Sequence, residues 1–174
     1  MVTRDVVVQR FSTVSYKPFR EVVEALHLML GHPDIPAFTS SMTAAANYAE
    51  LEKIVEDAVG SSGFIEFARF DIGAVLRKRS GAPTPHILRF VFGNPITLSQ
   101  MAKHVPDAAS YAPVTVLIQE RPDGVRLSYD RMASCLAPYG NIEALRVARE
   151  LDAKVEAMLM DAARAEAPPL GKTA

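Results

Sequence analysis

A single domain that combines α-helices with a β-sheet is the fold class that this sequence predicts. Residues 19–30 and 142–162 carry apolar side chains every three or four positions, the spacing of an amphipathic helix. Between them, residues 114–130 contain two stretches of alternating apolar and polar side chains on either side of Pro122-Asp123-Gly124, the pattern of a β-hairpin. The 174 residues fit one domain of ordinary size, which we expect to span residues 1–166.

Composition and charge exclude several classes of protein. Hydrophobic residues make up 49% of the chain and charged residues 22%, values typical of globular domains and not of disordered or fibrous chains. The formal net charge is −1, so we do not expect general nucleic-acid binding. No stretch approaches the ~18 uncharged apolar residues of a membrane span, and no membrane partner is expected. The N-terminal stretch lacks the apolar core of a secretory signal, and the single Cys135 has no disulfide partner, which favours a cytoplasmic location.

The first part of the chain predicts a strand followed by a helix. Residues 6–14 are rich in β-branched side chains, as expected of a strand. Pro18 then opens a helix that Gly31 ends, and His27 lies on the polar side of this helix, where a solvated surface residue is the favoured interpretation. Residues 32–41 contain two prolines and several hydroxyl side chains and are expected to form a loop.

The next segments predict a helix, a strand and a short helix. A helical pattern of apolar residues runs over residues 43–58. Residues 64–70 carry apolar side chains in both alternating sets, which indicates a central strand or a strand whose second face is covered. Asp71 is a suitable N-cap for a short helix over residues 72–79.

A further strand and two further helices complete the predicted elements. Residues 86–92 form a strand, and Thr97-Leu98-Ser99-Gln100 matches a capping box, which predicts a helix start just after Gly93-Asn94-Pro95. After the hairpin, Asn141 is a suitable cap for the long C-terminal helix. Residues 167–174 have prolines and no periodicity, so we expect a frayed tail.

Three motifs stand in a fixed order in the middle of the chain. They are Phe92-Gly93-Asn94-Pro95 at a strand end, Ala112-Pro113 before an apolar strand, and Pro122-Asp123-Gly124 before Ser128-Tyr129-Asp130. In this order the sequence resembles the domain-of-unknown-function 302 family, most closely over residues 48–130. The resemblance implies a two-layer sandwich, with helices packed on one face of a mainly antiparallel sheet, and a homodimer. It supplies no catalytic residue.

A basic segment predicts a binding site for a small anion. Residues 72–106 contain no acidic side chain and five lysines and arginines. The turn at Gly93 and Asn94, with a helix start near Thr97, offers backbone donors and positive potential to a carboxylate or phosphate. We therefore expect Arg89, Gly93, Asn94 and Thr97 to bind a small anionic molecule. A tight turn beside solvated cations is the alternative that needs no ligand.

Arg89 stands among the apolar residues of its predicted strand. A guanidinium in such a position is costly unless it is paired, and it does not deprotonate. We expect Arg89 to pair with Asp71, with Glu66 or with a bound anion.

His104 supports two alternative functions. With Tyr111 and Arg131 it could serve a small enzyme as general acid or base. Met101 and His104 are three residues apart on a helix, so they could also bind haem iron or a metal together. A core role for Met101 and a capping role for Asp107 are the interpretations without a ligand. No metal-ligand set is predicted, the cofactor stays open, and a homodimeric binding module for a small anion is the favoured function.

Overall fold

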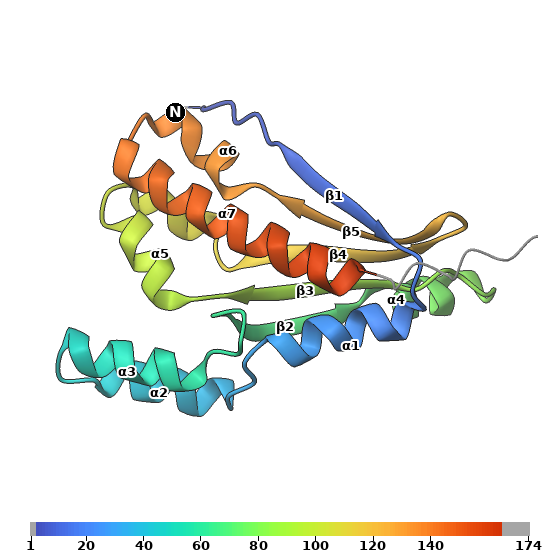
Figure 1. Cartoon of the computed structure of the whole chain (residues 1–174), viewed down its shortest axis with the longest axis horizontal. Coiled ribbons are helices and arrows are strands. Elements are labelled where there is room, and N and C mark those ends of the chain that lie inside the picture. Colours follow the sequence, from blue (N-terminus) through green and yellow to red (C-terminus); the bar gives the residue numbers. More distant parts are fainter. Residues whose placement is uncertain (1–2, 165–174) are drawn as a thin grey trace, which may run out of the picture.

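The protein folds into a five-stranded antiparallel sheet with helices packed on one face (Figure 1). The structure is a computed structural model that describes residues 3–164. The strands are β1 (Arg10–Ser15), β2 (Ile65–Asp71), β3 (Ile87–Gly93), β4 (Val114–Arg121) and β5 (Gly124–Asp130). The α-helices are α1 (Phe19–Met29), α2 (Ile35–Ala44), α3 (Tyr48–Ala58), α4 (Ile72–Ser80), α5 (Pro95–Ala102), α6 (Met132–Leu136) and α7 (Ile142–Ala163), and two 3-10 turns are η1 (Pro106–Ser110) and η2 (Ala137–Tyr139). The expected domain end at residue 166 and the tail 167–174 lie outside the described residues.

The strand order is β1-β5-β4-β3-β2, and every neighbouring pair is antiparallel. The predicted hairpin is confirmed: β4 and β5 meet at the pair Arg121 and Gly124, where Gly124 has a φ of 125° that favours glycine. β2 lies at the edge of the sheet and not at its centre. Its first residue, Ile65, is nevertheless fully buried, because helices α2 and α3 cover this end of the strand.

The main core lies between the sheet and helices α1 and α7. Val22 and Leu26 of α1 and Val155 of α7 pack with Phe90 of β3 and Val116 of β4, and all five side chains are buried. In Figure 1 the long helix α7 crosses the sheet, with α1 next to it. The predicted α+β two-layer architecture is therefore confirmed. Within residues 3–164, no helix combines the length and apolar character that a membrane crossing requires.

A second, smaller core explains helix α2, which the sequence did not predict. Residues 32–41 were expected to form a loop, but α2 begins at Ile35, because the Asp34 carboxylate accepts a hydrogen bond from the Ala37 N–H (2.8 Å). The helix predicted over residues 43–58 is split, since Asn47 leaves the helical conformation and caps α3. Together the two helices bury Phe38, Val55 and Ile65.

The chain crosses itself at Gly31, after α1, and Gly60, after α3. The Phe64 carbonyl oxygen accepts hydrogen bonds from both glycine N–H groups, at 2.8 Å and 3.0 Å, and the Gly31 carbonyl accepts one from the Glu66 N–H (2.9 Å). A Cβ atom on Gly31 would overlap the Ala58 carbonyl oxygen. Only glycine permits backbones to approach this closely, so the crossing pins the end of α1 to the start of β2.

Replacement of Gly31 by alanine should lower the free energy of unfolding by about 3 kcal/mol, because backbone and not a mobile side chain occupies the new methyl position. The matched control is Gly63→Ala, where φ is 78° but nothing lies within 4 Å of the new atom, so only about 1 kcal/mol of left-handed strain is expected. Urea unfolding of the two variants measures the difference. Equal losses would contradict the importance of the crossing.

Candidate functional site

A cavity of about 360 Å³ lies where the two cores meet, and it is partly open to solvent. Met42 of α2 and Phe67 of β2 come from the side of the smaller core, and Met101 of α5 and Leu151 of α7 come from the main core. The remaining lining residues are Gly93, Asn94, Pro95, Thr97, Leu98, Ala112, Pro113 and Val114. The cavity therefore contains two of the three motifs that stood out in the sequence.

Three of the four residues predicted to bind an anion line this cavity, and the fourth does not. Gly93, Asn94 and Thr97 are part of its wall. Arg89 is exposed on the sheet surface and lines a separate shallow depression with Arg10 and Asp130. Arg89 and Gly93 are four residues apart on one strand, about 13 Å, so one small ligand would not reach both.

The expected ion pair of Arg89 with Glu66 or Asp71 does not form in the described part of the chain, and pairing with a bound anion stays a prediction. Glu66 pairs with Arg69 (2.7 Å) and Asp71 pairs with Arg77 (3.4 Å), so both predicted acceptors are used by other guanidinium groups. Arg89 instead reaches water, because its face of the sheet is not covered at that position. The burial penalty that motivated the expectation does not arise.

The start of helix α5 is capped by the protein itself. The Asn94 carboxamide oxygen accepts hydrogen bonds from the N–H groups of Ile96 (2.8 Å) and Thr97 (3.2 Å). Its amide nitrogen donates to the Gly63 carbonyl oxygen (3.0 Å), which fixes the orientation of the side chain. The cap is thus Asn94 and not the predicted Thr97, and the backbone donors that an anion would need are already occupied.

Within residues 3–164, no hydrogen bond or ion pair joins any two of His104, Tyr111 and Arg131. Arg131 makes an ion pair with Glu156 of α7 (2.6 Å), and the Tyr111 hydroxyl is 3.3 Å from that of Tyr139. His104 is exposed in the turn after α5. Met101 is buried and lines the cavity, whereas His104 is not among the lining residues, so the two do not face one common site as haem or a metal would require.

The hairpin end instead holds a buried polar cluster. The Asp152 carboxylate of α7 accepts hydrogen bonds from the Tyr129 hydroxyl (2.7 Å) and from the N–H groups of Met132 (2.7 Å) and Ala133 (3.0 Å). It thereby caps the short helix α6 and joins it to α7 and β5. Burial raises the pKa of the Asp152 carboxyl, and the three donors partly oppose this shift.

One group of side chains in residues 3–164 has the composition and closeness of a metal site, namely His27, His32 and Glu66. The sequence alone favours a solvated surface position for His27 and predicts no metal ligands. The spacing of the two histidines across Gly31 was visible in the sequence, but nothing there linked them to Glu66, since the crossing at Gly31 and Gly60 brings the three together.

Fold and cavity define a small two-layer α+β protein with an apolar pocket at one end of its sheet. The family model described as "Domain of unknown function DUF302" matches residues 38–162, and the chain belongs to this family. It is also similar to the crystal structure of an uncharacterized conserved protein DUF302 from Bacillus stearothermophilus, with 10% identity, a TM-score of 0.63, and coverage of 89% of this chain and 98% of that one. At that identity the likeness concerns the fold alone. No curated protein matches the sequence.

Replacement of Asp152 by asparagine should lower the free energy of unfolding by about 2 kcal/mol at neutral pH, because the new amide N–H₂ would face backbone N–H donors. The raised pKa of Asp152 means that the folded state binds this proton more tightly than the unfolded state. The stability advantage of the wild type over Asp152→Asn should therefore shrink as the pH rises above about 3.9. Chemical unfolding of both proteins across this range measures the advantage, and an advantage that grows with pH would contradict the assignment.

Proposed function

We propose that this protein is a homodimeric binding module that holds a small, largely apolar molecule in the cavity between its two cores. The observation that carries the proposal is the cavity itself. Its volume of about 360 Å³ lies within the range of small-molecule sites, about 300–1,000 Å³. Its wall is almost entirely apolar, with Asn94 and Thr97 as the polar residues, and a few polar groups in an apolar wall are typical of ligand pockets.

The proposed ligand differs from the anion that the sequence suggested. An anion needs free donors or a cation, but Asn94 occupies the donors of α5 and Arg89 lies elsewhere. Apolar groups such as Phe67, Met101 and Leu151 favour a ligand that gains by leaving water. The Thr97 hydroxyl is then the group that would orient a polar end of the ligand.

The alternatives that depend on His104 receive no support from the geometry. An enzyme would need His104 to approach Tyr111 or Arg131 at a pocket, but Tyr111 lies beside Tyr139 and Arg131 beside Glu156. A haem protein would need an apolar cleft around the histidine, and His104 is exposed.

An apolar surface at the sheet edge supports the homodimer. Phe70, at the end of edge strand β2, is 49% exposed, and Ile72, Val75 and Leu76 of α4 are 39%, 64% and 36% exposed. The three residues of α4 share one helical face, because they are three and four positions apart. We call these four side chains the edge patch. A second copy of the chain is the proposed partner, since apolar patches next to an open strand edge favour self-association.

A cytoplasmic location belongs to the same proposal. Its support is Cys135, which is buried and free of any disulfide. Burial raises the pKa of the Cys135 thiol, so the group stays protonated and unreactive at neutral pH. A lone structural thiol of this kind is compatible with a reducing compartment.

The cavity should bind the neutral apolar dye Nile red with a saturable rise in fluorescence. Replacement of Thr97 by phenylalanine fills the cavity from its wall and should weaken binding by about tenfold or more, equivalent to about 1.4 kcal/mol. Gln100→Phe is the control, because Gln100 is exposed on the same helix and outside the lining. Inorganic phosphate should not compete. Equal dye binding by the two variants, or competition by phosphate, would exclude the apolar pocket as the site.

Light scattering of the 19.0 kDa chain at micromolar concentration should give the mass of a dimer. Val75→Glu places a charge in the edge patch and should give a monomer, because burial of an unpaired carboxylate is unfavourable. Leu28→Glu is the control, since Leu28 is 71% exposed on α1, outside the patch, and should leave the mass unchanged. A monomeric wild type would end the dimer proposal.

A further inference from the structure

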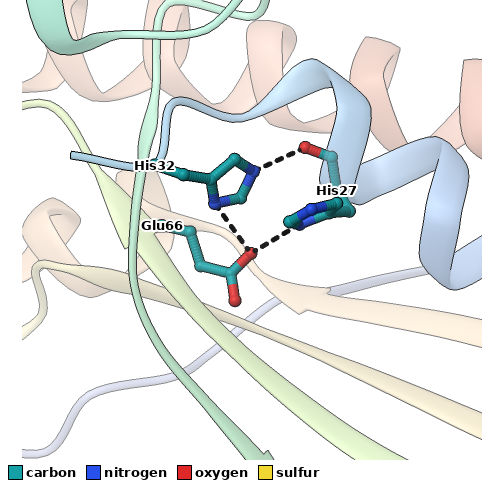
Figure 2. Close-up of side chains that lie close together, drawn as sticks. All are labelled: His27, His32 and Glu66. Atoms are coloured by element: carbon teal, nitrogen blue, oxygen red, sulfur yellow. Dashed lines mark hydrogen bonds and ion pairs between the residues drawn. The ribbon is translucent and has the colours of Figure 1, made fainter. Parts of the chain in front are cut away.

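We propose that His27, His32 and Glu66 form a binding site for a divalent first-row transition metal such as Zn²⁺, with a fourth position open to solvent. Figure 2 shows the two imidazole rings and the carboxylate directed toward one another. His27 Nδ1 lies 3.6 Å and His32 Nδ1 3.7 Å from Glu66 Oε2, and all three ligand atoms are within 4.8 Å of each other. The site is separate from the cavity of the proposed function and does not depend on it.

Backbone geometry brings the three residues together. His27 is in the last turn of α1, His32 follows Gly31, and Glu66 is the second residue of β2. The hydrogen bond from the Glu66 N–H to the Gly31 carbonyl oxygen holds the strand against the end of the helix. The site is therefore built on pinned backbone, which limits the conformational entropy that metal binding would cost.

The hydrogen bond of His32 defines which of its nitrogens can bind a metal. His32 Nε2 is 2.8 Å from the His27 carbonyl oxygen, which can only accept, so Nε2 carries the proton. In the neutral ring, Nδ1 then has its lone pair available toward Glu66 Oε2. A ring N–H held by a backbone carbonyl, with the other nitrogen unprotonated, is the usual arrangement of a metal-binding histidine.

The second histidine also has an unprotonated Nδ1, although a guanidinium donates to this nitrogen. His27 Nδ1 is 2.9 Å from Arg69 Nη2, and a guanidinium can only donate, so Nδ1 of His27 also presents a lone pair. Two nitrogen lone pairs and a carboxylate oxygen thus face one another. Three electron-pair donors at this separation repel one another unless a cation lies between them.

The distances and ligand types suit a tetrahedral ion. Ligand atoms about 2.1 Å from a tetrahedral Zn²⁺ are roughly 3.4 Å apart, close to the two measured separations. Two imidazoles and one carboxylate are ligands that zinc and similar ions accept, whereas Mg²⁺ prefers oxygen ligands in octahedral geometry. The histidine side chains are 40% and 37% exposed, so an ion can enter from solvent.

Arg69 supplies the positive charge that this cluster requires when no ion is bound. Its Nη2 donates to Glu66 Oε2 (2.7 Å), and its Nε donates to Oε1 (2.9 Å). A metal bound by Oε2 and by His27 Nδ1 displaces both contacts of Nη2, while the bond from Nε to Oε1 can continue to orient the carboxylate. Arg69 therefore competes with the ion through one nitrogen and supports its ligand through another.

A β-bulge explains how Glu66 and Arg69 reach the same place. Residues three apart on a regular strand point to opposite faces. In β2 the register shifts between Glu66 and Ala68, so that Glu66 is opposite Phe92 and Arg69 is opposite Phe90, on one face of the sheet. The guanidinium of Arg69 lies 4.3 Å above the Phe90 ring, which holds it near the carboxylate.

Titration calorimetry of the chelator-treated full chain with Zn²⁺ tests the site, with Mg²⁺ as the control ion. We expect one Zn²⁺ per chain, a higher melting temperature with Zn²⁺, and no response to Mg²⁺. His27→Ala, His32→Ala and Glu66→Gln should each weaken binding by about tenfold or more. His104→Ala is the matched control, because His104 is an exposed histidine outside the cluster and should bind as the wild type does.

Two further measurements keep the test decisive. Circular dichroism of each metal-free variant shows whether the fold is retained, and Co²⁺ absorption reports tetrahedral coordination in the wild type independently of stability. Arg69→Met removes the competing charge and should tighten Zn²⁺ binding several-fold. Absence of binding to the wild type, equal binding by folded Glu66→Gln and His104→Ala, or octahedral Co²⁺ spectra would overturn the site. Unchanged or weaker binding by Arg69→Met would overturn the role of Arg69.

Discussion

One carbonyl group, that of Phe64, accepts hydrogen bonds from two glycine N–H groups that are 29 positions apart in the sequence, and much of the structure depends on this meeting. Side chains at Gly31 and Gly60 would fill the space through which the backbones pass. The contact determines where α1 ends relative to β2, and therefore where the sheet edge lies. It also anchors the return of the chain from α3, so that the smaller core can form beside the sheet.

Two cores of unequal size give this protein its cavity. The larger core is closed by α1 and α7 on the sheet, whereas Phe38, Val55 and Ile65 are buried by α2 and α3 at one end. Side chains that belong to two separately packed units do not interdigitate completely where the units meet, and space remains between them. The motif Gly93-Asn94-Pro95 lies at this junction. The turn that it forms connects a strand of the larger core to helix α5, and the same residues line the cavity.

Elements with strong local signals were predictable from the sequence, and those that depend on distant contacts were not. The hairpin at Gly124 and the caps at Asp71 and Asn141 were confirmed, because turn and cap chemistry acts within a few residues. Helix α2 was missed although Asp34 supplies a local cap, since the burial of Phe38 that stabilises the helix involves a distant strand.

The same distinction applies to the candidate sites. Three residues of the cavity wall were identified from a local motif, but Arg89 was misplaced because alternation along a strand does not reveal which face the helices cover. His27, His32 and Glu66 lie close together because the backbone after α1 is hydrogen-bonded to the start of β2, more than 30 residues later. A single sequence carries no signal for such a distant backbone contact.

The bulge in β2 has a consequence for comparisons between members of the family. The extra residue, Phe67, leaves the ladder and faces the cavity, while Glu66 just before it belongs to the histidine cluster. A homologue that lacked this one residue would have a regular strand in which the acidic and the basic side chain, then two positions apart, still share one face of the sheet, while the cavity would lose the phenyl ring from its wall. For this strand, a single-residue gap in an alignment therefore marks a change in the wall of the cavity, while the charge balance beside the two histidines stays the same.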